Sequence, residues 1–399
     1  MPWVRADVSE QRIRFVVRAE ADKEPLAALC REFGIARPTG YRWLKRYREA
    51  GSMEAVVERS RRPAHSPVRT ETVQEERVEV LRRETGWGAK KLAVLLSEEG
   101  VPLKVITINR ILKRRGLVRK KESHTPALQR FERDAPNQLW QMDGKGEYRG
   151  AEGSCHPLSL LDDHSRYAVG LFALRGLTAE LAYPCVVRTF ERYGVPDAML
   201  LDHGSIWWGT TNSWGLTWFS VRLIEQGIDL IYGRVNHPQT QGKVERFHRT
   251  LDEAIRYRGK PKRMDQWGEV LEEFRDVYNH KRPHEALGMR RAADRYRPST
   301  RSYQPEPREW EYPEGSRVEQ LDENGRLRVE GRNWVVCEAL AKRRVRVEKV
   351  GELLLISYRH MYVREIDRQR GCTRALVRPR SLRRALPKEE NSSGDQWGV

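Results

Sequence analysis

Cysteine is scarce in this sequence, and none of it forms a metal-binding pattern. The 399 residues include five cysteines, with no C-x-x-C pair and no histidine beside them at zinc-finger spacing. This scarcity favours a reducing compartment and argues against structural zinc.

Long apolar runs are also missing. No uninterrupted apolar stretch reaches the roughly 18 residues that a membrane-spanning helix needs. The first residues read MPWVRADVSEQRIRF and carry charges where a signal peptide has its apolar segment. These absences predict a soluble, cytoplasmic chain without a membrane partner.

Acidic residues are outnumbered by basic ones. The chain has 74 Lys and Arg against 56 Asp and Glu, a net charge of +18 and a pI near 9.8. The net charge is +11 over residues 1–135, +2 over 136–300 and +5 over 301–399. Such an excess favours an anionic partner, most often nucleic acid, although some basic proteins are merely soluble. The uneven spread suggests that the ends bind and the middle does something else.

Residues 1–51 read as a helix-turn-helix domain. Three helix-like stretches cover residues 8–22, 23–34 and 37–51, and a tight turn with Gly34 separates the last two. In a helix-turn-helix the second helix of the pair enters the major groove of DNA. The alternative is an ordinary three-helix bundle with a solvated basic face. The residues expected to contact DNA are Tyr41, Arg42, Lys45 and Arg46.

The same theme recurs after a basic linker. Residues 52–70 contain prolines among Arg and Ser and read as the linker. Residues 71–120 then hold three amphipathic segments, which predict a second helix-turn-helix domain. Two such units in tandem suit an enzyme that finds particular DNA ends, and also suit a repressor. The expected DNA contacts here are Lys90, Lys91, Asn109, Arg110, Lys113 and Arg114.

The pattern changes from residue 136. Across 136–300, strands come first, with a turn at DDHSR, and then alternate with helices, which indicates a mixed sheet with helices on its faces. Residues 316–370 alternate again and predict a small β-barrel, with a hairpin turn at Asn324-Gly325. The tail, 381–399, is polar and predicted to be disordered.

Three acidic residues of the middle region stand where chemistry is plausible. Asp143 lies in LWQMDG, Asp202 ends the apolar run AMLLDHG, and Glu245 opens a basic helix after HPQTQG. Taken singly, an aspartate after a strand is usually a turn former, and Glu245 could simply pair with Arg249 four residues on. Carboxylates are the hard oxygen ligands that Mg²⁺ prefers. Cations beside Glu245 are expected to contact phosphates: Lys243, Arg246 and Arg249.

These segments resemble the integrase-core DDE transposases of bacterial insertion sequences, relatives of retroviral integrases. The residues that carry the resemblance are WQMD, LLDHG, HPQTQGKVERFHRTL and YNHKRPHEALG. The resemblance implies an RNase H-like core and two Mg²⁺ ions, with Mn²⁺ as a substitute, held by Asp143, Asp202 and Glu245. It also implies double-stranded DNA as partner and a homo-oligomer assembled on DNA, in the bacterial cytoplasm near the nucleoid.

The chain departs from the family pattern in three ways. The second aspartate is followed by His203-Gly204 in place of Asn-Gly, and 42 residues separate Asp202 from Glu245, more than is usual. The excess lies in SIWWGTTNSWG. The His/Cys zinc domain of retroviral integrases is absent, and helix-turn-helix units stand in its place.

Other candidates have simpler interpretations. Asp162 and Asp163 are read as hairpin residues. Asp252 lies seven residues beyond Glu245, about 10.5 Å along a helix, too far to share its metals. His280 and His284 have the spacing of a zinc pair, but Pro283 between them argues against a continuous helix. Stacking on unpaired bases or ordinary packing remains open for four tryptophans: Trp207, Trp208, Trp214 and Trp218.

The sequence therefore predicts a transposase that binds the terminal inverted repeats of its element, cleaves at the ends and joins the 3′-hydroxyls to target DNA. The alternatives are a non-catalytic DNA-binding regulator with a degenerate core, and a metal-dependent nuclease without strand transfer.

Overall fold

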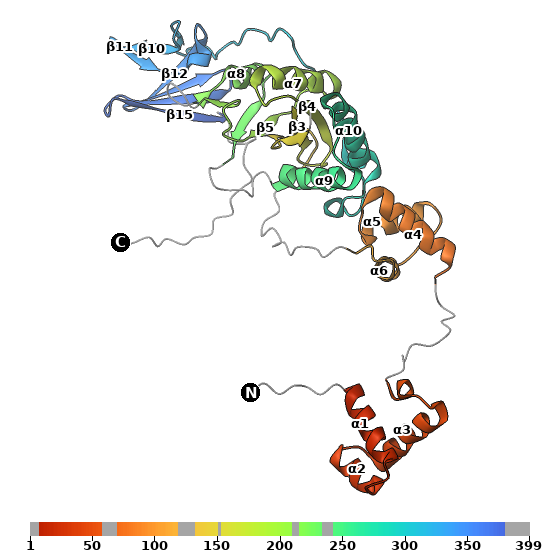
Figure 1. Ribbon diagram of the computed structural model, residues 1–399. Helices are drawn as coiled ribbons and strands as arrows, with labels where there is room; N and C mark the ends of the chain where they lie inside the picture. The colour runs from red at the N-terminus through yellow and green to blue at the C-terminus, as the bar shows by residue number, and fades with distance from the viewer. Residues whose placement is uncertain are drawn as a thin grey trace. The chain divides into compact units, whose positions relative to one another are not determined.

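The computed structural model describes residues 8–57, 70–118, 132–150, 153–209, 215–233 and 242–379. It divides into two compact units, Met1–Glu71 and Thr72–Val399 (Figure 1). Most of the expected linker, 58–69, and the whole expected tail, 381–399, lie outside the described residues. No helix in the described ranges is long and apolar enough to cross a bilayer.

The first unit is the expected set of three helices. They are α1 (Val8–Glu20), α2 (Leu26–Glu32) and α3 (Arg37–Ala50). Apolar residues at helical spacing form the core between them, including Phe15, Leu29 and Leu44. α3 ends at Gly51, which has a φ of 62°, a left-handed conformation that glycine adopts without strain.

The second unit begins with another three helices, again as predicted. They are α4 (Thr72–Thr85), α5 (Ala89–Glu98) and α6 (Val105–Arg114). Leu81, Leu92 and Ile108 are among the side chains that bury their shared core. Because α6 places its apolar residues on one side, its other side is left for charged and polar groups.

A mixed sheet follows, as the change of pattern predicted. Its strand order is β2-β3-β1-β5-β8, and β4 pairs with residues 156–161 of β3. β3 pairs in antiparallel fashion with β1, β2 and β4. β5 pairs in parallel fashion with β1 and with β8. The strands are β1 (Trp140–Gly144), β2 (Tyr148–Gly150), β3 (Gly153–Asp162), β4 (Ala168–Leu174), β5 (Ala198–Leu201) and β8 (Asp229–Tyr232).

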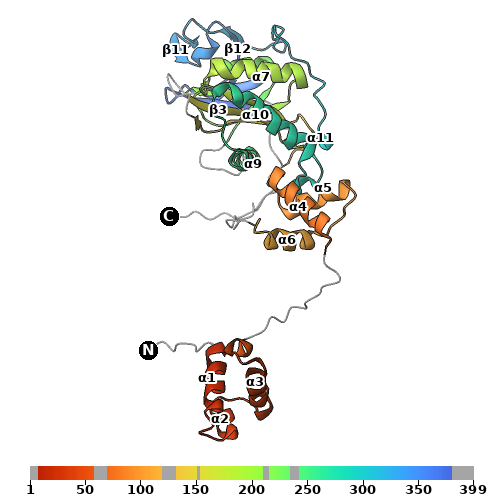
Figure 2. The same ribbon diagram turned by 45° about the vertical axis from the view of Figure 1, so that its right-hand side comes forward.

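Helices cover both faces of this sheet. α7 (Ala179–Tyr193) and α8 (Trp218–Glu225) pack on one face, and α9 (Gly242–Arg258) and α10 (Met264–Asp276) on the other (Figure 2). Successive side chains of a strand point to opposite faces, so a sheet buried on both sides needs near-continuous apolar strands. β5, with the sequence AMLL, is buried at all four positions.

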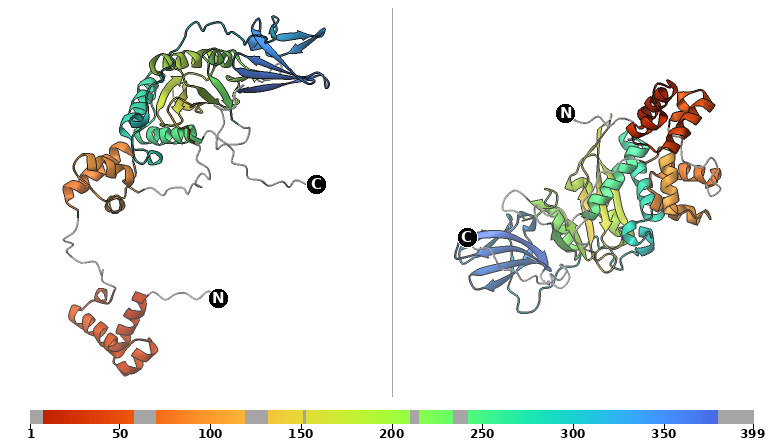
Figure 3. Two further views of the ribbon diagram at one scale, coloured as in Figure 1. Left: turned by 180° about the vertical axis from the view of Figure 1, so that it is seen from behind. Right: turned by 90° about the horizontal axis from the view of Figure 1, so that it is seen from below.

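The C-terminal region is antiparallel, but its sheet is open. Its order is β15-β14-β13-β12-β9, and in the described part of the chain the edge strands β15 and β9 are not paired (Figure 3). The expected barrel is therefore replaced by a five-stranded sheet and a separate two-stranded hairpin. The strands are β9 (Val318–Gln320), β10 (Arg326–Val329), β11 (Arg332–Val335), β12 (Arg344–Val350), β13 (Leu353–Tyr358), β14 (Met361–Asp367) and β15 (Cys372–Pro379).

The hairpin expected at Asn324-Gly325 is wrong. The strands on either side of it, β9 and β10, pair with β12 and β11 and not with each other. The side chain of Asp322 accepts hydrogen bonds from the N–H groups of Asn324 and Arg326, each at 2.8 Å, and closes the chain into a local turn. The Gly325 N–H also donates to the Asp322 carbonyl oxygen at 3.1 Å, so the chain turns here without the two flanking strands pairing with each other.

The true two-residue hairpin comes one turn later, at Glu330-Gly331. Their φ angles are 52° and 79°, and Val329 on β10 lies opposite Arg332 on β11. Two central residues with positive φ define the type I′ turn, which matches the twist of the flanking strands. Glutamate is an unusual residue at the first position, so the sequence signal was weaker here than at Asn324-Gly325.

The C-terminal sheet docks on the central domain through α8. Glu225 at the end of α8 is buried, accepts a hydrogen bond from the Tyr358 hydroxyl at 2.9 Å, and forms an ion pair with Arg343 at 3.0 Å. The hairpin of β6 (Trp208–Gly209) and β7 (Gly215–Leu216) adds to this contact, because the Cys337 thiol donates to the Leu216 carbonyl at 3.3 Å. β7 thus packs against the C-terminal region.

His284 makes the stability of the second unit sensitive to acid. Its Nε2 lies 2.9 Å from the Tyr278 carbonyl oxygen, and burial, together with the Arg282 charge, lowers its pKa from 6.5 to about 4. The unfolded chain therefore binds a proton below pH 6.5 that the folded chain excludes. The stability that neutral His284 contributes is present above pH 6.5 and is lost as the pH falls toward 4.

We therefore expect the free energy of unfolding to fall by up to about 1.4 kcal/mol per pH unit across this window from His284 alone. Urea unfolding followed by tryptophan fluorescence at pH 7 and pH 5 measures it. His284→Gln is destabilised at pH 7, and its gap to wild type narrows at pH 5 because glutamine does not titrate. A gap that stays constant between the two pH values would contradict the prediction.

Candidate active site

The pairing of β1 with β5 brings two aspartates together. The strands run parallel, with Trp140 opposite Met199 and Gln141 opposite Leu200. Continuing this register by two residues places Asp143 opposite Asp202, just past the end of β5. Neighbouring strands lie about 4.8 Å apart, so the two carboxylates leave the sheet side by side at the same edge.

Asp143 is in an environment that opposes its negative charge. Burial, repulsion by Asp202 and repulsion by Glu245 raise its pKa to about 7, although a hydrogen bond from the Gly144 backbone opposes the shift. His248 on α9 lies beside it, with Nδ1 3.6 Å from Asp143 Oδ2, but burial lowers the pKa of His248 to about 4. Neutral His248 therefore does not neutralise Asp143.

Asp202 is held at the start of a loop. Its Oδ1 accepts a hydrogen bond from the Gly204 N–H at 2.9 Å. His203, the residue that departs from the family pattern, turns away to pack its ring against Trp208 and Tyr232, with centroids 5.1 and 5.6 Å apart. The substitution of His for Asn at this position is thus used in an aromatic contact with the inserted hairpin.

Glu245 reaches the site from the other side, on the first turn of α9. Val244, Phe247 and Leu251 recur at helical spacing and are buried against the sheet, and this leaves Glu245 exposed. Among the described residues, no ion pair joins Glu245 to Arg249. The charge of Glu245 contributes to the raised pKa of Asp143, after burial and the charge of Asp202.

The three carboxylates suit a hard divalent cation by their chemistry. All are oxygen donors, and a cation between them would relieve the repulsion that raises the pKa of Asp143. Within the described ranges, however, no group of three or more potential ligands is gathered closely enough to hold a metal ion. Bringing Glu245 to the aspartates therefore depends on how the first turn of α9 is held.

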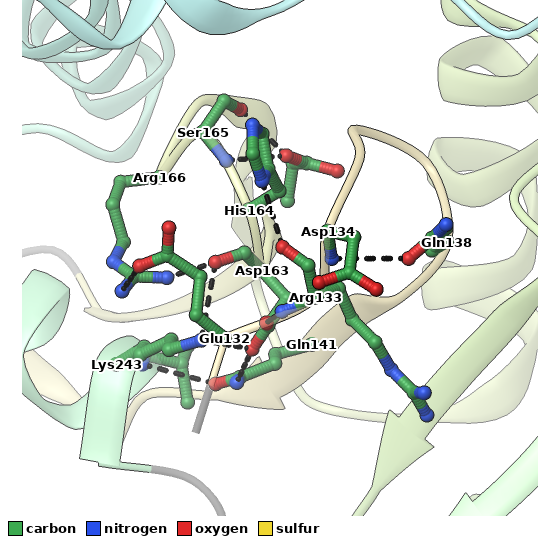
Figure 4. A network of polar contacts seen from close by, with 12 residues as sticks. Glu132, Arg133, Asp134, Gln138, Gln141, Asp163, His164, Ser165, Arg166 and Lys243 are labelled. Carbon is green, nitrogen blue, oxygen red and sulfur yellow. Dashed lines mark hydrogen bonds and ion pairs between the residues drawn. The ribbon is translucent and has the colours of Figure 1, made fainter. Parts of the chain in front are cut away.

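The DDHSR turn contains more than hairpin residues. Asp162 does serve the turn, because it accepts hydrogen bonds from the N–H and the hydroxyl of Ser165 at 2.8 and 2.6 Å. Asp163, in contrast, reaches Gln141 on β1 and Lys243 on α9 (Figure 4). No sequence pattern indicates this role of Asp163, since it arises only when three distant segments meet.

The remaining candidates take structural roles. Asp252 accepts a hydrogen bond from the Tyr148 hydroxyl at 2.7 Å and pairs with Lys145 at 3.1 Å. His284 lies beyond the break at Pro283, and its Nε2 faces a backbone carbonyl. Trp207 is buried against Phe219, with ring centroids 5.3 Å apart, and Trp218 packs on Tyr183 at 5.3 Å. Trp214 lies outside the described residues.

The basic residues expected to contact DNA differ in how they are engaged. On α3, Tyr41 and Arg42 are exposed, Lys45 pairs with Glu49 at 3.6 Å, and the Arg46 guanidinium lies over the Trp43 ring. On α6 the exposed side carries Asn109, Arg110 and Lys113, none of them in an ion pair within the described part of the chain, with Ile106 also exposed beside them.

Other predicted contacts are joined to carboxylates of the protein itself. Lys90 and Lys91 both reach Glu285, at 3.3 Å, and Arg114 pairs with buried Glu75. Lys243 pairs with Asp163, and burial lowers its pKa to about 8. Arg246 and Arg249 are exposed on α9.

Comparison with known families agrees with this arrangement. Residues 133–238 and 226–291 each match a family described as Integrase core domain. Residues 11–64 match a family described as Helix-turn-helix domain, and residues 39–112 one described as Homeodomain-like domain.

A curated protein of Sinorhizobium fredii (strain NBRC 101917 / NGR234) is named "Putative transposase y4bF". It is 28% identical over 222 residues, which are 53% of this chain and 46% of that protein. The chain thus spans about half the length of this relative.

Two solved structures also match. The HTLV-2 integrase catalytic core domain in complex with magnesium is 14% identical, with a TM-score of 0.32 over 41% of this chain and 97% of that chain. A chain of the simian T-cell lymphotropic virus intasome in complex with PP2A regulatory subunit B56 gamma is 14% identical, with a TM-score of 0.37 over 76% of this chain and 96% of that chain.

The packing of α9 can be tested through Phe247. This side chain is 1% exposed and lies edge-on to Tyr278, with ring centroids 4.7 Å apart. Phe247→Ala should lower the free energy of unfolding by about 3–5 kcal/mol, because it removes buried area and leaves a cavity. Urea unfolding measures the loss. Arg249→Ala, on the exposed side of the same helix, should change stability by less than about 0.5 kcal/mol. Equal effects of the two variants would show that α9 is not packed as described.

Proposed function

We propose, on the premise that this chain belongs to the integrase-core transposases of insertion sequences, that it binds the terminal inverted repeats of its element. In this proposal it cleaves the DNA at the element's ends and joins the resulting 3′-hydroxyls to target DNA. The chain's own helix-turn-helix domains would bind the ends, and its integrase core would carry out the chemistry.

The observation that supports the proposal is the register of β1 and β5, which sets Asp143 beside Asp202. The pKa of Asp143 is raised to about 7, first by its burial and then by the charges of Asp202 and Glu245. A carboxylate whose ionisation is opposed in this way is typical of a functional site, where a bound cation would offset the negative charges.

Asp143, Asp202 and Glu245 would hold two Mg²⁺ ions, for which Mn²⁺ would substitute. When bound, such a pair supplies activation of the attacking oxygen and stabilisation of the departing oxygen in an in-line displacement at phosphorus. The chain's residues would set the geometry: the ends of β1 and β5 fix the two aspartates, and α9 brings Glu245. His248 is neutral, and its Nε2 lies 2.8 Å from the Ser159 hydroxyl on β3. Ser159 lies opposite Asp143 in the sheet, so this contact helps to keep α9 against β3 beside the site.

The two basic helical units support the DNA-binding part of the proposal. The exposed side of α3 and that of α6 each carry side chains that suit base edges and phosphates. Transposition needs two DNA ends to be held together, so we propose a homo-oligomer that assembles on DNA.

The catalytic part is tested by cleavage and joining assays with the DNA that flanks the gene, in Mg²⁺, in Mn²⁺ and in EDTA. Glu245→Gln should lower the rate more than about 100-fold, as expected when a group that stabilises transition-state charge is removed. Glu253→Gln, on an exposed position two turns along α9, is the matched control and should keep the wild-type rate.

Binding of the ends without cleavage in either metal would overturn the proposal in favour of a DNA-binding regulator. Metal-dependent cleavage without joining would instead favour a nuclease.

The DNA-reading part is tested on α6. Asn109→Ala and Arg110→Ala should each weaken binding to the element's end by roughly 10- to 100-fold and reduce its preference over scrambled DNA, because bidentate contacts to bases are lost. Fluorescence anisotropy at a fixed salt concentration measures both. Arg83→Ala, an exposed arginine that pairs with Glu79 on α4, is the control. Unchanged preference in both α6 variants would show that α6 does not read the ends.

A further inference from the structure

Two polar attachments hold the first turn of α9 to the sheet. The Lys243 ammonium lies 2.5 Å from Asp163 Oδ1 and donates to the Asp163 carbonyl oxygen at 3.1 Å. The Val244 N–H donates to Gln141 Oε1 at 3.3 Å. The first four N–H groups of a helix have no partner within it, so Gln141 caps α9 from the neighbouring strand.

Asp163 and Gln141 are themselves joined. Gln141 Nε2 donates to Asp163 Oδ1 at 2.8 Å, and the Arg133 N–H donates to Asp163 Oδ2 at 2.9 Å (Figure 4). Asp163 is completely buried and Gln141 is 1% exposed. Each oxygen of the Asp163 carboxylate therefore has a hydrogen-bond donor, which leaves the side chain a single orientation.

This network lies next to the proposed metal ligands on two elements at once. Gln141 is two residues before Asp143 on β1, and Lys243 is two residues before Glu245 on α9. The apolar side of α9 attracts the helix to the sheet but is not directional, so it tolerates small rotations and slides. Hydrogen bonds and ion pairs are directional, and these are located at the end of the helix that carries Glu245.

We propose that Asp163 is a positioning residue that, through Lys243 and Gln141, fixes Glu245 relative to Asp143 and Asp202. This inference rests on the proposed function, since it assigns Glu245 to a metal site. Buried ion pairs contribute little net stability, so an apolar pair would stabilise the protein as well as Asp163 and Lys243 do. A positioning role for Asp163 explains why a charged pair is present.

The competing explanation is that the pair is only structural, and a double variant separates the two. Asp163→Asn alone leaves the Lys243 charge buried without its carboxylate, which destabilises any protein. Asp163→Asn with Lys243→Met removes both charges and keeps the volumes similar. If the pair is only structural, this double variant behaves like wild type. If Asp163 positions Glu245, the double variant folds but binds metal weakly.

The expected result is a 10- to 100-fold rise in the Mg²⁺ concentration for half-maximal cleavage, the usual effect of losing a residue that orients a metal ligand. Mn²⁺ binding to the full-length protein on end DNA, measured by electron paramagnetic resonance, should weaken by the same factor. DNA affinity by anisotropy should not change. Gln141→Met, which removes the cap on Val244, should shift the metal dependence in the same direction and serves if the double variant does not fold.

Glu225→Gln is the matched control. It breaks the ion pair between buried Glu225 and partly exposed Arg343, on the face of the sheet opposite α9. It should lower the urea midpoint and leave the metal dependence at the wild-type value. This comparison distinguishes a general loss of stability from a displaced Glu245.

Wild-type metal dependence in both the double variant and Gln141→Met would overturn the inference and leave the proposed function intact. A wild-type protein that neither cleaves DNA nor binds Mn²⁺, or Glu245→Gln with full activity, would overturn the proposed function and the inference with it.

Discussion

The hydrogen-bond ladder between two parallel strands forces two like charges together at the edge of the central sheet. Once Trp140 lies opposite Met199, Asp143 and Asp202 follow side by side. The pKa of Asp143 is raised to about 7 by its burial and, next, by the neighbouring charge of Asp202. The rest of the second unit can be understood as the structure that holds these charges and brings a third to them.

Secondary structure followed closely from local pattern, whereas contacts between distant segments did not. The helices of both N-terminal units, the order of strands and helices in the core, and the buried side of α9 were all predictable from apolar spacing and glycine stops. The site residues Asp143, Asp202 and Glu245 were selected by resemblance and position, and they remain predictions. Asp163 was missed because its partners, Gln141 and Lys243, are 22 and 80 residues away along the chain.

The C-terminal region shows a second limit of local pattern. Asn-Gly is a strong hairpin signal, yet a single carboxylate at Asp322 bound the nearby N–H groups and turned the chain elsewhere. For the inserted Trp-rich segment, the sequence pattern likewise did not distinguish ordinary packing from stacking on bases. The neighbouring Leu216 on β7 accepts a hydrogen bond from Cys337, 121 residues away, and only the folded chain shows this contact with the C-terminal region.

α9 connects the candidate active site to the second helical domain. Glu245 lies on its first turn, and Tyr257 near its other end donates a hydrogen bond to the Arg82 carbonyl of α4 at 2.9 Å. Tyr257 lies twelve positions after Glu245, which corresponds to about 18 Å of rigid helix. Further contacts join the same two parts: Lys90 and Lys91 reach Glu285, and Arg291 reaches Glu98. In the proposed function, the exposed side of α6 would face the DNA, since these cations are engaged within the protein. The length of α9 would then determine the distance between Glu245 and a base sequence bound by α6. An enzyme that cuts at a defined position from its recognition sequence requires such a defined distance.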